Sequence, residues 1–106
     1  MALRSNARFS VRCPIAFSGD DIKGDGAVIN ISQTGWMVAS NQWVQRGTYL
    51  TLRITLPDQE IPLEVDQAVV RWSTGREFGL EFLSMQPDAQ ERLNRFLSTL
   101  ETSQNT

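Results

Sequence analysis

Residues 50–56 read Leu50-Thr-Leu-Arg-Ile-Thr-Leu56, so an apolar residue occupies every second position. Successive side chains of a β-strand point to opposite faces, and this alternation is typical of a strand with one face in a core and the other in solvent. The turn-forming pair Pro57-Asp58 follows directly. We therefore predict a strand over residues 49–56.

The same alternation recurs in both directions along the chain, at intervals of about ten residues. It predicts further strands over residues 9–17, 27–31, 36–39, 61–72 and 78–82. Residues 18–26 have the composition of a turn. In the first strand, Pro14 implies an edge position or a bulge, and a change of apolar phase predicts a bulge near Asp66. Gly79 indicates a kink or the close approach of another backbone segment.

Beyond Pro87 the apolar period becomes that of an amphipathic helix. The apolar positions that would share one helical face are Ala89, Leu93, Phe96, Leu97 and Leu100. Six short strands and one helix favour a six-stranded antiparallel β-barrel, with the helix over one open end or one apolar face. We expect one domain, with an N-terminal arm at residues 1–8, the barrel and helix at 9–100, and a polar tail at 101–106.

The composition excludes several classes of function. The 106 residues are 41% hydrophobic and 21% charged, which is typical of a globular domain, and no apolar run reaches the ~18 residues that cross a bilayer. No apolar leader follows Met1, so we expect a cytoplasmic protein. With no His, the chain cannot build a Ser-His-Asp triad or an imidazole zinc site. Its net charge of −2 argues against binding a nucleic-acid polymer.

The remaining candidates for metal or redox chemistry have simpler explanations. Cys13 is the only thiol, and we expect it to be a small buried apolar residue. Asp20, Asp21 and Asp25 lack the spacing of a calcium-binding loop, so we interpret them as turn residues. We expect no metal, no cofactor and no enzymatic activity.

The positive charge is concentrated near the N-terminus. Nine of the ten cationic residues are Arg, and Arg4, Arg8 and Arg12 lie in the first twelve residues, where there is no acidic residue. The planar fork of Arg suits phosphate oxygens and the Hoogsteen edge of guanine. The alternative is a solvated arm with scattered charge.

Two motifs distinguish these interpretations. Arg4-Ser-Asn-Ala-Arg8 and Asn30-Ile-Ser32-Gln-Thr-Gly35 resemble the R-x-x-x-R and (D/N)-x-S-x-x-G signatures of the PilZ domain family. The second motif lies between two predicted strands, as the family requires. Later segments also resemble the family and extend the similarity over nearly the whole chain: Leu50-Thr-Leu-Arg-Ile-Thr-Leu-Pro57, Ala68-Val-Val-Arg-Trp72 and Glu77-Phe-Gly-Leu-Glu-Phe82.

The resemblance implies a bacterial receptor module for cyclic di-GMP, built as a six-stranded barrel with a C-terminal helix. Cyclic di-GMP is a dianion with two guanine rings. Arg4 and Arg8 would supply guanidinium donors from a flexible arm that folds over the ligand. Asn30 and Ser32 would face the same side of one strand and meet a guanine edge, with Ile31 in the core. Gly35 would permit the turn and the approach of the ligand, although the second motif is also compatible with a simple turn.

Trp72 is a further candidate, because in some relatives the Trp of a similar segment lies beside a guanine. It is equally compatible with a place in the core or at the barrel rim. We assign Trp36 and Trp43, which have no support from a motif, to packing.

The function implied is that of a receptor and adaptor without an output domain of its own. Cyclic di-GMP would change its surface and so regulate an unidentified partner protein, with no direct insertion into a membrane. The alternative is a PilZ interaction module that does not respond to the nucleotide. The intact motifs favour the first function.

Overall fold

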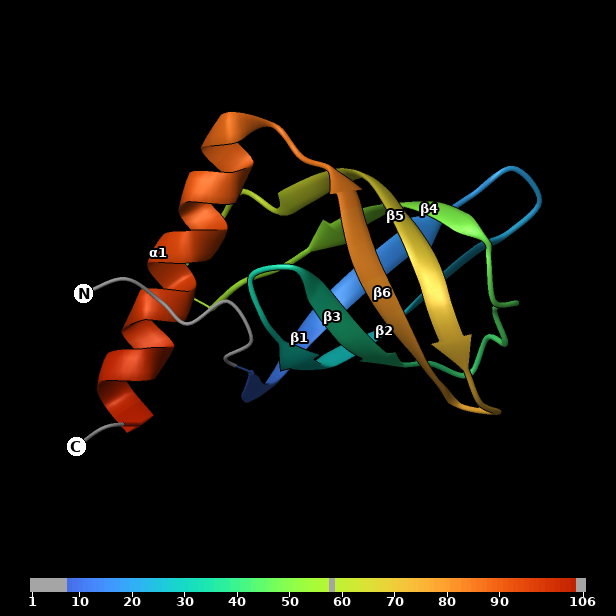
Figure 1. Cartoon of the computed structure of the whole chain (residues 1–106), viewed down its shortest axis with the longest axis horizontal. Coiled ribbons are helices and arrows are strands. Elements are labelled where there is room, and N and C mark those ends of the chain that lie inside the picture. The colour runs from blue at the N-terminus through green and yellow to red at the C-terminus, as the bar shows by residue number, and fades with distance from the viewer. Residues whose placement is uncertain (1–7, 58, 105–106) are drawn as a thin grey trace.

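The computed structural model describes residues 8–57 and 59–104. Most of the predicted arm, including Arg4, therefore lies outside the described residues. The described chain forms seven elements (Figure 1). They are β1 (Phe9–Ser18), β2 (Lys23–Ile31), β3 (Gly35–Ala39), β4 (Tyr49–Ile54), β5 (Leu63–Ser73), β6 (Glu77–Ser84) and α1 (Pro87–Gln104).

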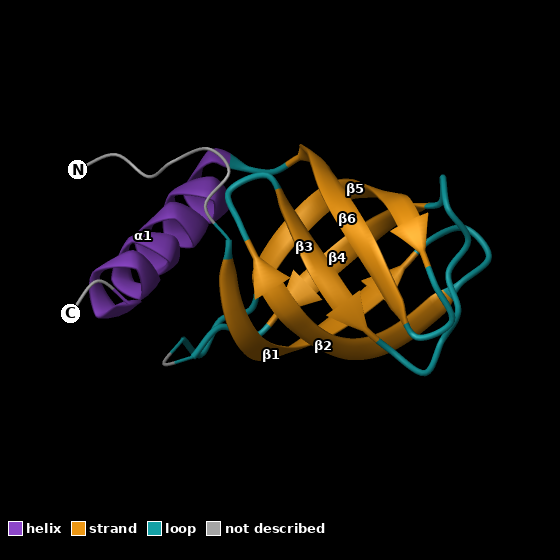
Figure 2. Cartoon of the chain, turned by 60° about the horizontal axis from the view of Figure 1, so that its bottom comes forward, coloured by secondary structure: helices purple, strands orange, loops and turns teal. Residues whose placement is uncertain are grey.

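The strands form a closed barrel in the order β1-β2-β3-β6-β5-β4, and every neighbouring pair is antiparallel. Pairing of Ile15 with Ile54 and of Ser18 with Thr51 joins β1 to β4 and closes it. Figure 2 shows the strands curving around one interior, with α1 outside one end of the barrel. The predicted six-stranded antiparallel barrel with a C-terminal helix is confirmed.

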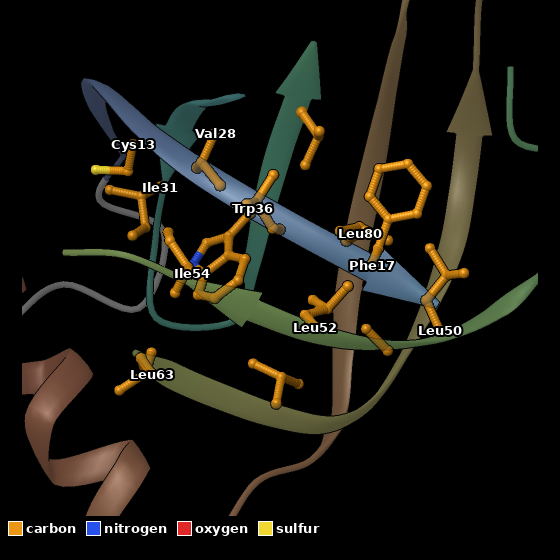
Figure 3. Packing of buried hydrophobic residues seen from close by; sticks show 14 of the residues in the cluster. Cys13, Phe17, Val28, Ile31, Trp36, Leu50, Leu52, Ile54, Leu63 and Leu80 are labelled. Carbon is orange, nitrogen blue, oxygen red and sulfur yellow. The ribbon is translucent and has the colours of Figure 1, made fainter. Parts of the chain in front are cut away.

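The core fills the barrel with the inward-facing residues of every strand (Figure 3). Trp36 is the largest of them and is 1% exposed, so its prediction as a packing residue is confirmed. Its ring meets that of Phe82 edge to face, with centroids 4.7 Å apart. Cys13 is also 1% exposed, as predicted. Burial raises the pKa of its thiol, and a backbone hydrogen bond at Arg12 opposes the shift more weakly.

The helix α1 packs its apolar face against β5 and β1. Leu93 and Leu97 are almost fully buried, as the helical period predicts. Arg92 fastens the connection between β4 and β5 to the helix, because its guanidinium donates to Gln59 Oε1 at 2.6 Å. The helix continues beyond Leu100 into the segment predicted as a polar tail. Among the residues described, no helix is both long enough and apolar enough to span a bilayer.

Some local predictions require correction. The strand β2 begins at Lys23 rather than near Ala27, and Gly26 lies within it. A Cβ atom at Gly26 would lie 2.3 Å from the carbonyl oxygen of Ala39, so this glycine allows two strands to approach closely and does not form a turn. The turn itself is shorter, and Gly19 N–H donates to Ile22 O at 2.7 Å across it.

The irregularities of the sheet are only partly where the sequence predicts them. The bulge near Asp66 is confirmed, because Leu50 pairs with Ala68 whereas Leu52 pairs with Val65. Pro14 does not lie on an edge, since the barrel is closed. The bulge of β1 lies just before it, where the register with β2 shifts between residues 10 and 13.

Trp43 was also assigned to packing, and this prediction is wrong. Its side chain is 58% exposed, whereas the neighbouring Val44 is completely buried. Only one of two adjacent residues can point into the barrel here, and Val44 takes that place. The indole is therefore left on the surface.

Candidate functional site

The second motif forms the turn between β2 and β3, and Ser32 organises this turn. Its hydroxyl donates to Gly35 O at 2.9 Å and accepts hydrogen bonds from the N–H groups of Gly35 and Thr34, at 3.2 and 3.3 Å. Ser32 is 1% exposed. The strand β2 ends at Ile31, so Ser32 does not continue the alternation that was expected to place it beside Asn30. The hydroxyl of Ser32 therefore makes its shortest hydrogen bonds within the turn.

Arg8 joins the first motif to the second. It immediately precedes β1, whose Phe9 pairs with Ile31 of β2. Arg8 Nε donates to Asn30 Oδ1 at 2.5 Å, and Arg8 Nη1 lies 3.4 Å from Ser32 Oγ. The side chain of Arg8 is exposed, whereas that of Asn30 is half-buried. Residues separated by more than twenty positions thus meet at one point on the barrel surface.

Gly35 is required by the packing of the barrel itself. A Cβ atom at this position would lie 2.2 Å from the carbonyl oxygen of Leu80 on β6. Next to this contact the two segments are also joined by a backbone hydrogen bond, which Phe82 N–H donates to Thr34 O at 3.0 Å. The glycine of the motif therefore permits β3 to approach β6, whether or not a ligand is bound.

A row of paired residues connects the second motif to Trp72. Asn30 pairs with Met37 on β3, Met37 pairs with Gly79 on β6, and Gly79 pairs with Trp72 on β5. Asn30, Met37 and Gly79 face outward, because buried residues lie next to them in sequence: Ile31, Trp36, Val38, Phe78 and Leu80. Trp72 turns outward after a register shift of β5 against β6 between Val70 and Trp72. The row thus crosses four strands on the outer wall of the barrel.

The indole of Trp72 lies directly over Gly79. A Cβ atom at Gly79 would be 2.1 Å from Trp72 Nε1, so any larger residue would displace the ring. Trp72 is 40% exposed. Gly79 was expected to mark a kink or the close approach of another backbone segment, and the close approach is made by this side chain. The outer wall therefore presents a guanidinium and an amide at one end of the row and an aromatic ring at the other.

Sequence reasoning missed a charged pair beside this row. Arg71 Nε lies 2.5 Å from Glu81 Oε1, and both side chains are about half exposed. Glu81 pairs with Gly35 across β3 and β6, and Arg71 precedes Trp72. The only sequence signal was the position of Arg71 within the Val-Val-Arg-Trp segment. No group of three or more metal-ligating side chains occurs within the described part of the chain.

Comparison with known proteins identifies the family. The sequence profile of the PilZ domain matches residues 2–99. The chain belongs to the PilZ domain family. PilZ domains are a family of cyclic di-GMP-binding and adaptor modules. No curated protein matches the sequence significantly.

Two solved structures resemble this PilZ protein. One is the Bacillus subtilis inhibitor of motility (MotI/DgrA), with a TM-score of 0.77 and 21% identity, and the match covers 100% of this chain. This chain spans only 55% of that protein. The other is the PilZ domain of CeSA from a cellulose-synthesizing bacterium, with a TM-score of 0.70, 15% identity, and coverage of 91% of this chain and 99% of that domain. At these identities the likeness demonstrates the shared fold.

Proposed function

We propose that this PilZ protein binds cyclic di-GMP on the outer wall of the barrel, between the Arg8 and Asn30 pair and Trp72. The observation that carries the proposal is the meeting of the two family motifs through the hydrogen bond from Arg8 to Asn30. An exposed guanidinium fixed beside an amide is suited to a phosphate or a guanine edge.

The chemistry of the ligand matches the groups along the row. Arg8 and, from the arm, Arg4 supply charge-assisted hydrogen bonds to the dianion, each worth about 1.5–3 kcal/mol. The amide of Asn30 offers both a donor and an acceptor to a guanine. The exposed face of Trp72 can stack on a purine, which contributes roughly 1–3 kcal/mol. The absence of a side chain at Gly79 lets the indole of Trp72 lie close against the wall.

The binding function acts through a surface change, and catalysis has no part in it. The ligand and the arm together alter the outer wall of β2 and β3, which a partner protein then recognises. Linkage requires the partner and the nucleotide to tighten each other's binding by the same factor, typically corresponding to ~1–3 kcal/mol. One protein of this fold is named as an inhibitor of motility, and another is a domain of CeSA from a cellulose-synthesizing bacterium. The fold therefore does not identify the partner.

The alternative is an interaction module that is indifferent to the nucleotide. This alternative is favoured because Ser32 stabilises the β2–β3 turn and Gly35 allows β3 to approach β6. Both residues of the second motif would be needed for the fold even if no ligand were bound. Arg8 separates the two functions, because its side chain is exposed and lies outside the core while it contacts Asn30 and Ser32 of the second motif.

Isothermal titration calorimetry tests the proposal directly. Cyclic di-GMP should bind the wild-type protein, cyclic di-AMP should not, and Arg8→Ala should weaken binding at least tenfold, which corresponds to about 1.4 kcal/mol. Arg53→Ala is the matched control, because Arg53 is an exposed Arg on β4 that lies away from the row and pairs with Glu64 at 3.6 Å. No heat of binding with the wild-type protein, or equal affinity for the Arg8→Ala variant, would favour the nucleotide-independent module.

A further inference from the structure

A hollow lies at the end of the barrel opposite α1. It has a volume of about 780 Å³ and is open to solvent. The β1–β2 turn, the connection between β3 and β4, and the beginning of β4 form its walls, and all three lie on the side of the barrel away from the helix (Figure 1). The hollow shares no residue with the Arg8, Asn30 and Trp72 row. Its size is sufficient for several side chains of a bound segment.

Two exposed aromatic residues line this hollow. Trp43 and Tyr49 are each 58% exposed, although both belong to a part of the chain that is firmly held. Val44 is fully buried beside Trp43, and Gly47 N–H donates to Val70 O at 2.8 Å. On the other side, Ser40 Oγ donates to Asp25 O at 2.6 Å. The indole is thus presented to solvent by fixed backbone, and such rigid aromatic anchors are enriched at protein interfaces.

The negative charge of the hollow favours a cationic occupant. Asp20, Asp21 and Asp66 line it, and no Lys or Arg is among its lining residues. One carboxylate oxygen of Asp66 accepts a hydrogen bond from Gln86 Nε2 at 3.0 Å, and Asp20 and Asp21 lie exposed at the tip of the β1–β2 turn. A nucleotide or another polyanion would be repelled. A cationic side chain would find carboxylates together with two exposed aromatic side chains, whose rings attract cations.

We propose that this hollow is a docking site for a basic segment of a partner protein. An Arg side chain of that segment lies against Trp43 and Tyr49, and its charge is balanced by Asp20 and Asp21. The site is separate from the proposed cyclic di-GMP site, because none of its lining residues belongs to the Arg8, Asn30 and Trp72 row. It gives the protein a second means of holding a partner.

The test uses hexa-arginine as the probe and hexa-citrulline as its control, since citrulline has nearly the shape of Arg without the charge. The three tryptophans give three indole N–H signals in a two-dimensional NMR spectrum, and a Trp43→Phe variant assigns one of them. Hexa-arginine should shift the Trp43 signal and the amides of residues 19–22 and 43–49. The Trp36 and Trp72 signals should stay in place, and hexa-citrulline should shift none.

Matched variants separate this site from general attraction to an acidic protein. Trp43→Ala should weaken hexa-arginine binding about fivefold, the loss of one cation–aromatic contact, and the double variant Asp20→Asn/Asp21→Asn should weaken it at least as much. Asp88→Asn/Glu101→Gln makes the same change in net charge on α1 and should leave affinity within about twofold. Equal affinity of the Trp43→Ala variant, or shifts spread over the surface without Trp43, would overturn the proposal.

Discussion

Ser32→Ala should destabilise the free protein much more than Arg8→Ala does. The substitution removes a hydroxyl that is 1% exposed and leaves the buried N–H of Gly35 without its hydrogen-bond acceptor. An unsatisfied buried donor costs about 1–3 kcal/mol. With an unfolding entropy of about 2.1 cal/mol/K per residue, this loss should lower the Tm by roughly 4–14 °C. Arg8 is exposed, so Arg8→Ala should cost under about 1 kcal/mol and lower the Tm by about 4 °C or less.

Thermal unfolding followed by circular dichroism, without nucleotide, measures both effects. Ser98→Ala is the control, because it makes the same substitution at an exposed position of α1 and should change stability by no more than about 0.5 kcal/mol. In calorimetry with cyclic di-GMP the order should reverse, with Arg8→Ala losing more affinity per folded molecule than Ser32→Ala. A Ser32→Ala variant as stable as the wild-type protein would refute the assignment of its hydroxyl to the turn.

Three further outcomes are expected. Gly79→Ala should displace the indole of Trp72 and weaken cyclic di-GMP binding roughly 5- to 100-fold, while circular dichroism still reports a folded barrel; unchanged affinity would remove Trp72 from the site. Burial raises the pKa of the Cys13 thiol, so just above the ordinary thiol pKa of 9.0 this thiol ionises in the unfolded chain but not in the folded protein. The free energy of unfolding measured in urea should therefore fall as the pH rises from about 9 towards the folded pKa, and the Cys13→Ala variant should lack this fall. Hydrogen exchange at residues 2–8 should slow when cyclic di-GMP is added, and equal exchange in both states would exclude a closing arm.

The barrel could be predicted from the sequence because its cause is local. Alternation of apolar residues in stretches such as residues 50–56 determines which face of a strand enters the core, and the change of period after Pro87 determines the helix. The glycines were harder to interpret. Gly26 and Gly79 are required by atoms of distant residues, Ala39 and Trp72, and nothing in the neighbouring sequence reveals these contacts.

The residues of the candidate site could be predicted from the sequence, but their arrangement on the barrel surface could not. The second motif identified Asn30 and a later segment that resembles the family identified Trp72, but only the register of four strands brings them into one row across Met37 and Gly79. A shift of one residue in any pair would turn part of the row inward. The exposure of Trp43 also depended on a tertiary choice, because either it or Val44 could have filled the end of the barrel.

The location of cyclic di-GMP on the outer wall is tested most directly by titrating the nucleotide into ¹⁵N-labelled protein and following the same three indole signals. The largest shifts are expected at the Trp72 indole and at the amides of Arg8, Asn30 and residues 34–37, with the Trp43 indole and residues 19–22 unchanged. The absence of shifts at millimolar nucleotide, or shifts centred on Trp43 with the Trp72 indole unmoved, would contradict it.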